Sequence, residues 1–318
     1  MRRFVAVISL VLLAAVAGPA GAPAHAVVPG NNGKIVYARA TWTSFLRYDI
    51  VVANADGSNP KVVAGPYPQD AFDDHFIANW SPDGSNLIFM ANQVIWKVNA
   101  NGSDLHPIFA PPEGTGVDDG PTYTPDGQHI VFTRCCPEGF GYSLWMIDAD
   151  GTDLTNITTE PQVNGDGPAE TSPQVSPDGT RIAFNRCFPD APCVIATVGI
   201  HGHNLQELTE NTSYEANHPN WSPDSRWIVF QMHYFGGGAD IARIRPDGTG
   251  FKQLTFYGEA ARNGAFDPCF SPEGTRILFS KFVSTGGNDL YTMSPNGTDV
   301  SQVTRTASLE FSPQWAAR

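Results

Sequence analysis

A short segment of this chain, Trp80-Ser81-Pro82-Asp83-Gly84, introduces a turn that returns with small changes at later places. The later copies begin at Thr124, Ser176, Ser222 and Ser271. Proline presets φ at the second position of a turn, aspartate suits the third, and glycine accepts the positive φ of the fourth. We therefore expect a tight reversal between two β-strands at each of these places.

Strand-forming residues surround each of these turns. Apolar β-branched and aromatic runs follow them, which indicates strands that are covered on both faces. These runs are Leu87-Ile88-Phe89, Ile130-Val131-Phe132, Ile182-Ala183-Phe184, Ile228-Val229-Phe230 and Ile277-Leu278-Phe279, with Ile35-Val36-Tyr37 as a sixth. A further strand follows each run and ends in a residue-Gly pair, which is a strong hairpin signal. These pairs are Asp56-Gly57, Asn101-Gly102, Asp150-Gly151, His201-Gly202, Asp247-Gly248 and Asn296-Gly297.

The spacing of the repeat identifies the architecture. The aromatic or apolar residue before each turn recurs at Trp80, Tyr123, Val175, Trp221 and Phe270, and again at Trp315. Periods of about 40 to 50 residues with four strands each are typical of β-propeller blades. The first repeat lacks its first strand, and the C-terminus supplies a first strand followed by almost nothing. A stacked solenoid would leave these two incomplete ends unexplained.

The sequence therefore predicts an all-β fold, a six-bladed β-propeller of four-stranded antiparallel blades. We expect the C-terminal strand Leu309–Ala316 to pair with Lys34–Arg39 in the first blade and so close the ring. The expected blades span about 30–65 plus 309–318, 75–110, 118–159, 170–210, 216–256 and 264–305.

The N-terminus has the pattern of a signal peptide covering residues 1–26. Arg2 and Arg3 precede the apolar run Phe4–Ala17, and Ala24-His25-Ala26 has the form of a cleavage site. The alternative is a membrane anchor. It is disfavoured because the run Phe4–Ala17 is shorter than the roughly 20 apolar residues that a membrane span needs. We expect a secreted or periplasmic protein, residues 27–318, with no membrane span after cleavage.

The net charge of the chain excludes one class of partner. The chain has 32 acidic against 19 basic Lys and Arg residues, a formal net charge of -13. An acidic protein repels polyphosphate, so we expect no nucleic-acid binding.

The motifs resemble the TolB-like, WD-repeat-like β-propeller family. Asn54-Ala55-Asp56-Gly57-Ser58 and the Trp80–Gly84 turn match its hairpins and turns directly. The resemblance implies the propeller fold over nearly the whole mature chain. Propellers of this family serve as envelope binding proteins and as domains attached to peptidases. True TolB proteins carry an α/β domain ahead of the propeller. Only a few residues lie between the expected signal peptide and the first expected blade, so we do not expect that domain here and do not carry over the contacts made through it.

A search for catalytic motifs favours binding over catalysis. The sequence contains neither a Gly-x-Ser-x-Gly elbow nor a His-Glu-x-x-His helix motif. Acidic residues and histidines instead precede or begin the first strand of each repeat, where a propeller rims one mouth of its channel. They are Asp74, His75, Asp118, Glu170, Glu215, His218, Asp267 and Glu310. This ring could bind a cationic peptide or a cation; the alternative is a set of loop residues that cap strand ends.

Cysteines provide a further structural prediction. Cys187 and Cys193 flank a short connection between two strand-like runs, so a disulfide bond could join them in an oxidising compartment. The alternative is two small buried residues.

Taken together, the residues favour a non-enzymatic module that binds an envelope or secreted protein or peptide. We expect a monomer without a cofactor, although the channel could hold a divalent cation. Two alternatives stay open. One is a metal-dependent carbohydrate lyase or hydrolase with His75 or His218 as base, and the other is a cell-wall polymer binding protein.

Overall fold

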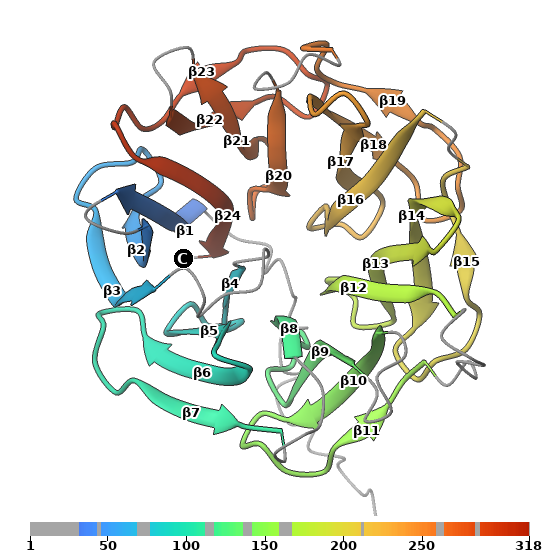
Figure 1. Cartoon of the computed structure of the whole chain (residues 1–318), viewed down its shortest axis with the longest axis horizontal. Helices are drawn as coiled ribbons and strands as arrows, with labels where there is room; N and C mark the ends of the chain where they lie inside the picture. The colour runs from blue at the N-terminus through green and yellow to red at the C-terminus, as the bar shows by residue number, and fades with distance from the viewer. Residues whose placement is uncertain are drawn as a thin grey trace, which may run out of the picture.

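The structure is a computed structural model that describes residues 32–42, 46–68, 77–111, 118–135, 142–158, 167–210, 213–258, 264–283 and 287–317. The expected signal peptide, residues 1–26, lies outside this part. The described residues form β-strands arranged around a central axis (Figure 1). None of them forms a helix long and apolar enough to cross a membrane.

Four antiparallel sheets of four strands follow one another around the ring. The first has β4 (Ala78–Trp80), β5 (Asn86–Ala91), β6 (Val94–Asn99) and β7 (His106–Phe109). The second has β8 (Asp118–Tyr123), β9 (His129–Cys135), β10 (Tyr142–Asp148) and β11 (Thr155–Asn156). The third has β12 (Ala169–Val175), β13 (Arg181–Phe188), β14 (Ala191–Gly199) and β15 (Gln206–Glu207). The fourth has β16 (Tyr214–Trp221), β17 (Ile228–Tyr234), β18 (Ala239–Ile244) and β19 (Lys252–Gln253).

The remaining strands form one eight-stranded sheet. Its members are β1 (Asn32–Trp42), β2 (Leu46–Asn54), β3 (Lys61–Pro68), β20 (Ala265–Phe270), β21 (Ile277–Val283), β22 (Gly287–Met293), β23 (Ser301–Gln302) and β24 (Leu309–Ala317). The predicted pairing of the C-terminal strand with the first strand is present, with Ile35 opposite Trp315 and Arg39 opposite Glu310.

The prediction of six separate blades is wrong. The structure has four separate four-stranded blades, because the last repeat and the first are joined into a single sheet. The joint is a parallel pairing in which Asn288 of β22 lies opposite Leu309 of β24, while β24 also pairs with β1. The sequence pattern shows where strands begin and end, but it carries no signal for this pairing between repeats.

The hydrophobic core lies between neighbouring sheets. One cluster joins Ala183 and Ile195 of the third sheet to Trp221 and Phe230 of the fourth. A phenylalanine in the second strand of five repeats is fully buried, namely Phe89, Phe132, Phe184, Phe230 and Phe279, and Tyr37 is buried at the same place in the first repeat. Burial against a sheet on each side explains why these strands are apolar on both faces.

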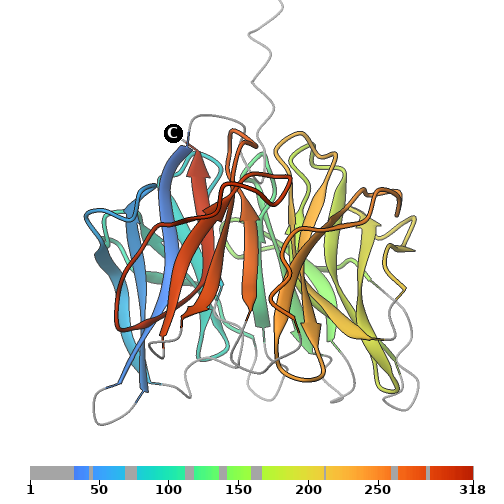
Figure 2. The ribbon, with the colours of Figure 1, turned by 90° about the horizontal axis from the view of Figure 1, so that it is seen from above.

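The repeated turns are held by their own side chains. Ser81 Oγ donates to Asp83 Oδ1 at 2.6 Å and accepts the Asn86 backbone N–H at 2.9 Å. Gly84 has φ of 67°, as the fourth position of the turn requires. The side view shows the strands running between two faces (Figure 2). We call the face with these turns and the residue-Gly hairpins the turn face, and the opposite face, where the first strands begin, the entry face.

Candidate functional site at the channel mouth

The innermost strands share an irregularity where a residue precedes proline. Register shifts separate Thr171 from Gln174, Asn217 from Asn220 and Phe266 from Cys269. Residues before proline in these strands have a positive φ; they are Gly120 (59°), Ser172 (53°), His218 (52°), Asp267 (51°) and Ser312 (48°). Such a conformation is costly for a side chain other than glycine, so the surrounding sheet must impose it.

Four residues at equivalent places on neighbouring inner strands line two adjoining cavities. Ile77, His218, Asp267 and Ser312 contribute to both. The smaller cavity has a volume of about 20 Å³ and is also lined by Ser172. The larger one has a volume of about 250 Å³. The bulge therefore turns Ser172, His218, Asp267 and Ser312 toward a common space.

A chain of hydrogen bonds connects β16, β20 and β24 at this place. His218 Nδ1 lies 2.5 Å from Asp267 Oδ1, and the other carboxylate oxygen of Asp267 accepts the Ser312 backbone N–H at 2.9 Å. Two amide side chains fix the backbone: Asn185 Oδ1 accepts the His218 N–H at 2.9 Å, and Gln231 Oε1 accepts the Asp267 N–H at 3.2 Å. The carboxylate and the imidazole are thus held in a defined position.

Two buried oxygen atoms at the cavities have no hydrogen-bond partner in the structure. One is Ser172 Oγ, at the smaller cavity, and the other is Asn288 Oδ1, at the larger. A buried polar atom without a partner is costly, and a bound group that donates a hydrogen bond would remove that cost.

Aromatic side chains form the apolar part of the larger cavity. Phe266, Phe282 and Phe311 are each half-buried there, beside Asp267 and Asn288. Phe311 also packs edge-on against Tyr48, with ring centroids 5.9 Å apart. The site can therefore accept a small apolar side chain and, next to it, donors that reach carboxylate and amide oxygens.

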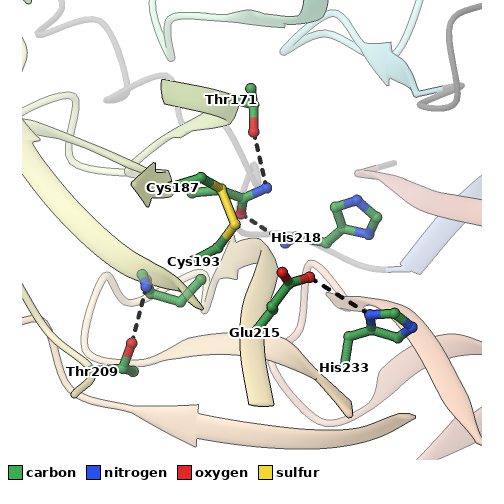
Figure 3. The surroundings of a disulfide bond; sticks show 9 residues. Thr171, Cys187, Cys193, Thr209, Glu215, His218 and His233 are labelled. Atoms are coloured by element: carbon green, nitrogen blue, oxygen red, sulfur yellow. Dashed lines mark hydrogen bonds and ion pairs between the residues drawn. A yellow bond between two sulfur atoms is a disulfide. The ribbon is translucent and has the colours of Figure 1, made fainter. Parts of the chain in front are cut away.

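The structure brings together His218 and Asp267 of the predicted ring, but it separates others. Glu170 on β12 is 3% exposed, and its carboxylate pairs with Arg186 Nη1 at 2.7 Å. Glu215 on β16 lies 3.7 Å from His233 of the neighbouring strand β17, outside the two cavities (Figure 3). Asp74 and His75 lie outside the described residues. Asp118 begins β8, and its side chain also lies outside the described part.

Glu310 on β24 is buried in the seam rather than in the cavities. It has no exposed surface and accepts hydrogen bonds from the hydroxyl groups of Thr304 and Thr306. Burial raises the pKa of this carboxyl, and the charge of Asp289 acts in the same direction. The hydrogen bonds from the threonines partly oppose this shift.

Sequence reasoning missed Ser172, Ser312, Asn288 and the three phenylalanines. A signal was present for the serines, because each precedes a proline in the repeated inner strand, as His218 and Asp267 do. Asn288 and the phenylalanines have no such shared pattern. Phe282 and Asn288 lie opposite each other on β21 and β22, and the closure of β24 adds Phe311 to the same cavity.

The cysteine prediction has a direct counterpart. Cys187 and Cys193 form a disulfide bond that joins β13 to β14 (Figure 3). Cys269 is a free thiol and is buried. Among the described residues, no group of three or more His, Cys, Asp or Glu side chains is arranged to hold a metal ion.

Comparison with known proteins agrees with this architecture. Residues 70–265 match the family model of the TolB β-propeller domain. An uncharacterized protein of Agrobacterium fabrum is 23% identical over 66% of this chain and 69% of its own length. The Tol-Pal system protein TolB of Francisella tularensis is 30% identical over 32% of this chain, which corresponds to 22% of that protein.

Among solved structures, TolB from Acinetobacter baumannii superimposes with a TM-score of 0.71 at 19% identity. The match covers 92% of this chain and 68% of that one. This likeness concerns the fold. Because the family model matches more than half of the residues, the chain belongs to the TolB β-propeller domain family.

Proposed function

We propose that the protein is a non-enzymatic binding module of the cell envelope and that the channel mouth holds a segment of a partner protein or peptide. The observation that carries this proposal is the larger cavity, where an acidic group, an unpartnered amide oxygen and three phenylalanine rings lie side by side. A peptide segment presents apolar side chains next to N–H donors, so its chemistry complements this surface.

Electrostatics supports a partner that is locally cationic. Asp267 is 13% exposed and the whole chain carries a formal charge of -13, so a positive segment would be attracted to the molecule. The position of Asp267 is already fixed by His218 and Ser312. Binding therefore costs little ordering of the receptor.

The relatives support an extracytoplasmic location. One of them is a Tol-Pal system protein, and the sequence of residues 1–26 has the form of a signal peptide. We propose that the mature protein begins at Val27. N-terminal mass analysis of protein recovered from the extracytoplasmic fraction tests this start.

Affinity capture from an envelope extract tests the binding proposal. Purified protein is used as bait beside two variants, Asp267→Asn and Phe282→Ala. Asp267→Asn removes the charge but keeps the shape, and Phe282→Ala opens the apolar wall. We expect a partner that the wild type retains and that is lost with either variant. Asp267→Asn should reduce affinity at least about tenfold because it removes a charged hydrogen bond, and Phe282→Ala should reduce it because it removes apolar contact.

The matched control is Asp190→Asn, which removes an exposed carboxylate from the β13–β14 hairpin on the same face. It should retain the partner. If Asp190→Asn and Asp267→Asn weaken capture equally, the attraction is general and the channel-mouth proposal fails.

A further inference from the structure

A further cavity lies on the turn face, between the third and fourth sheets. Its volume is about 420 Å³, and three arginines line it, Arg181, Arg226 and Arg245. They come from different turns: Arg181 begins β13, Arg226 precedes β17, and Arg245 follows β18. Three guanidinium groups around one cavity are unexpected in a chain with 19 basic and 32 acidic residues.

Two of these arginines depart from the repeat. The residue two places after the turn carboxylate is Ser85, Thr180 or Thr275 in three other turns, and its hydroxyl donates to that carboxylate. Arg226 occupies this place and uses only its backbone N–H, which donates to Asp224 at 3.2 Å. The turn forms without the hydroxyl group, so the scaffold does not require arginine here.

Arg245 departs in the same way. Its backbone N–H donates to the Thr249 carbonyl, as the equivalent residue does in every other residue-Gly hairpin. The equivalent side chains are short or absent; they are Asn54, Asn99, Asp148, Gly199 and Ser294. Arg245 Nη1 also donates to Thr249 Oγ1 at 3.4 Å, a contact that the short amides of Asn54 and Asn99 make to a serine hydroxyl in their own hairpins. Because a short amide is enough for this contact, the hairpin does not require the length or the charge of arginine.

Two carboxylates, Asp178 and Asp247, also line the cavity, and their nearest partners are hydroxyl and N–H groups of their own turns. Asp178 Oδ1 accepts hydrogen bonds from Ser176, from the Thr180 hydroxyl and from the Thr180 N–H. Asp247 Oδ1 accepts two from Thr249. Hydrogen bonds from Thr249 and the charge of Arg245 lower the pKa of Asp247. Among the described residues, Arg181, Arg226 and Arg245 form no ion pair, and three guanidinium groups against two carboxylates leave the cavity with a positive charge.

The guanidinium of Arg245 is held in place by an aromatic ring. It lies 4.6 Å from the centroid of Trp227, which Arg243 also contacts at 4.2 Å. A methyl group on Gly250 would lie 3.0 Å from Arg245 Nη1 and 3.2 Å from the Trp227 ring. Gly250 therefore leaves room for the contact, which positions the cation before any ligand arrives.

The sheets are also farther apart at this place. A methyl group on Gly151 or Gly202 would lie 2.3 or 2.1 Å from a carbonyl oxygen of the preceding sheet. On Gly248, beside the cavity, the corresponding distance to the Leu208 carbonyl oxygen is 3.8 Å. Ser225 replaces the usual turn glycine despite its φ of 56°, and its Oγ accepts the Asp178 N–H of the neighbouring sheet at 3.1 Å.

We propose that this cavity is a binding site for a compact oxyanion with at least two negative charges, such as a phosphate ester or a polycarboxylate. Guanidinium groups match both phosphate and carboxylate with paired N–H donors. The site lies on the face opposite to the channel mouth, so it does not depend on the function proposed for that mouth.

Titration calorimetry of the full mature chain at low salt tests this site, with pyrophosphate and citrate as the two probes. Binding of one ligand per chain is expected, and the stronger probe tells whether phosphate or carboxylate is preferred. Arg226→Gln and Arg245→Gln should each weaken binding at least about tenfold. Arg226 makes no side-chain contact that folding needs, so this variant reports on the site alone.

The matched control is Arg305→Gln, which removes the same charge from an exposed position outside the cavity. It should bind like the wild type, as should Asp267→Asn. Absence of binding by both probes, or equal weakening by Arg305→Gln and Arg226→Gln, would overturn the proposal.

Discussion

Glu310 shows how a single residue can link stability to pH. Its carboxyl group is fully buried in the seam, and burial raises its pKa above the ordinary value. A raised pKa in the folded state means that the fold favours the protonated form. The contribution of Glu310 to stability is therefore complete below the unfolded pKa of about 4.3 and is lost as pH rises through the folded pKa.

Replacing Glu310 by glutamine should remove this dependence. Relative to Glu310→Gln, the wild type is expected to lose thermal stability as pH is raised from about 4 to about 8, because only the wild type must ionise a buried group. Thermal unfolding of both proteins across this range measures the difference. Glu210→Gln, at an exposed position, is the control, and its unfolding temperature should follow the wild-type curve. A constant difference between Glu310→Gln and the wild type would contradict the expectation.

The position of Glu310 could not be predicted from the sequence. Its position at the start of a first strand suggested a place in the channel mouth, as it did for Glu170. Inner strands are packed on both faces, so a residue one or two places from the bulge points between sheets instead of into the channel. Glu170 accordingly pairs with Arg186, and Glu310 meets Thr304 and Thr306. Sequence alone does not fix which residue the bulge turns inward.

Among the elements, the residue-Gly hairpins were predicted well because their chemistry is local. What the pattern does not show is that each hairpin also packs on the preceding sheet. Gly202 has φ of 84°, and a methyl group there would lie 2.1 Å from the Ile157 carbonyl oxygen of the second sheet. Gly248 has a similar φ of 81°, but a methyl group there would lie 3.8 Å from the Leu208 carbonyl oxygen.

Alanine substitutions at Gly202 and Gly248 distinguish the cost of backbone strain from the cost of lost packing. Both Gly202→Ala and Gly248→Ala incur the cost of a positive φ, roughly 1–2 kcal/mol. Only Gly202→Ala also forces the hairpin away from its neighbour, so it should be the more destabilising by at least about 1 kcal/mol. Urea unfolding of the two variants measures the difference. Equal losses of unfolding free energy would show that packing of the hairpin on the adjacent sheet does not contribute to stability.

For the whole molecule, the repeat established the all-β propeller and the pairing of the two chain ends, but it did not establish how the sheets divide. Identical repeats predict identical blades. The last strand instead contacts two neighbours, β1 through a long antiparallel register and β22 through one parallel pair. This closure brings Phe311 of β24 to Phe266 of β20 and Phe282 of β21, and the three rings form the apolar wall of the channel-mouth cavity.

Closure by β24 should therefore decide whether the ring exists at all. Removal of residues 309–318 leaves the eleven-residue strand β1 without its partner on one side and takes Trp315 from the core. A long exposed strand edge pairs with other chains, so the truncated protein should aggregate, as light scattering would record. Adding a peptide of residues 309–318 during refolding should restore the soluble form, because it supplies the missing edge. A truncated chain that remains soluble and unfolds at the wild-type temperature would show that the ring is held by the contacts between sheets and not by its closing strand.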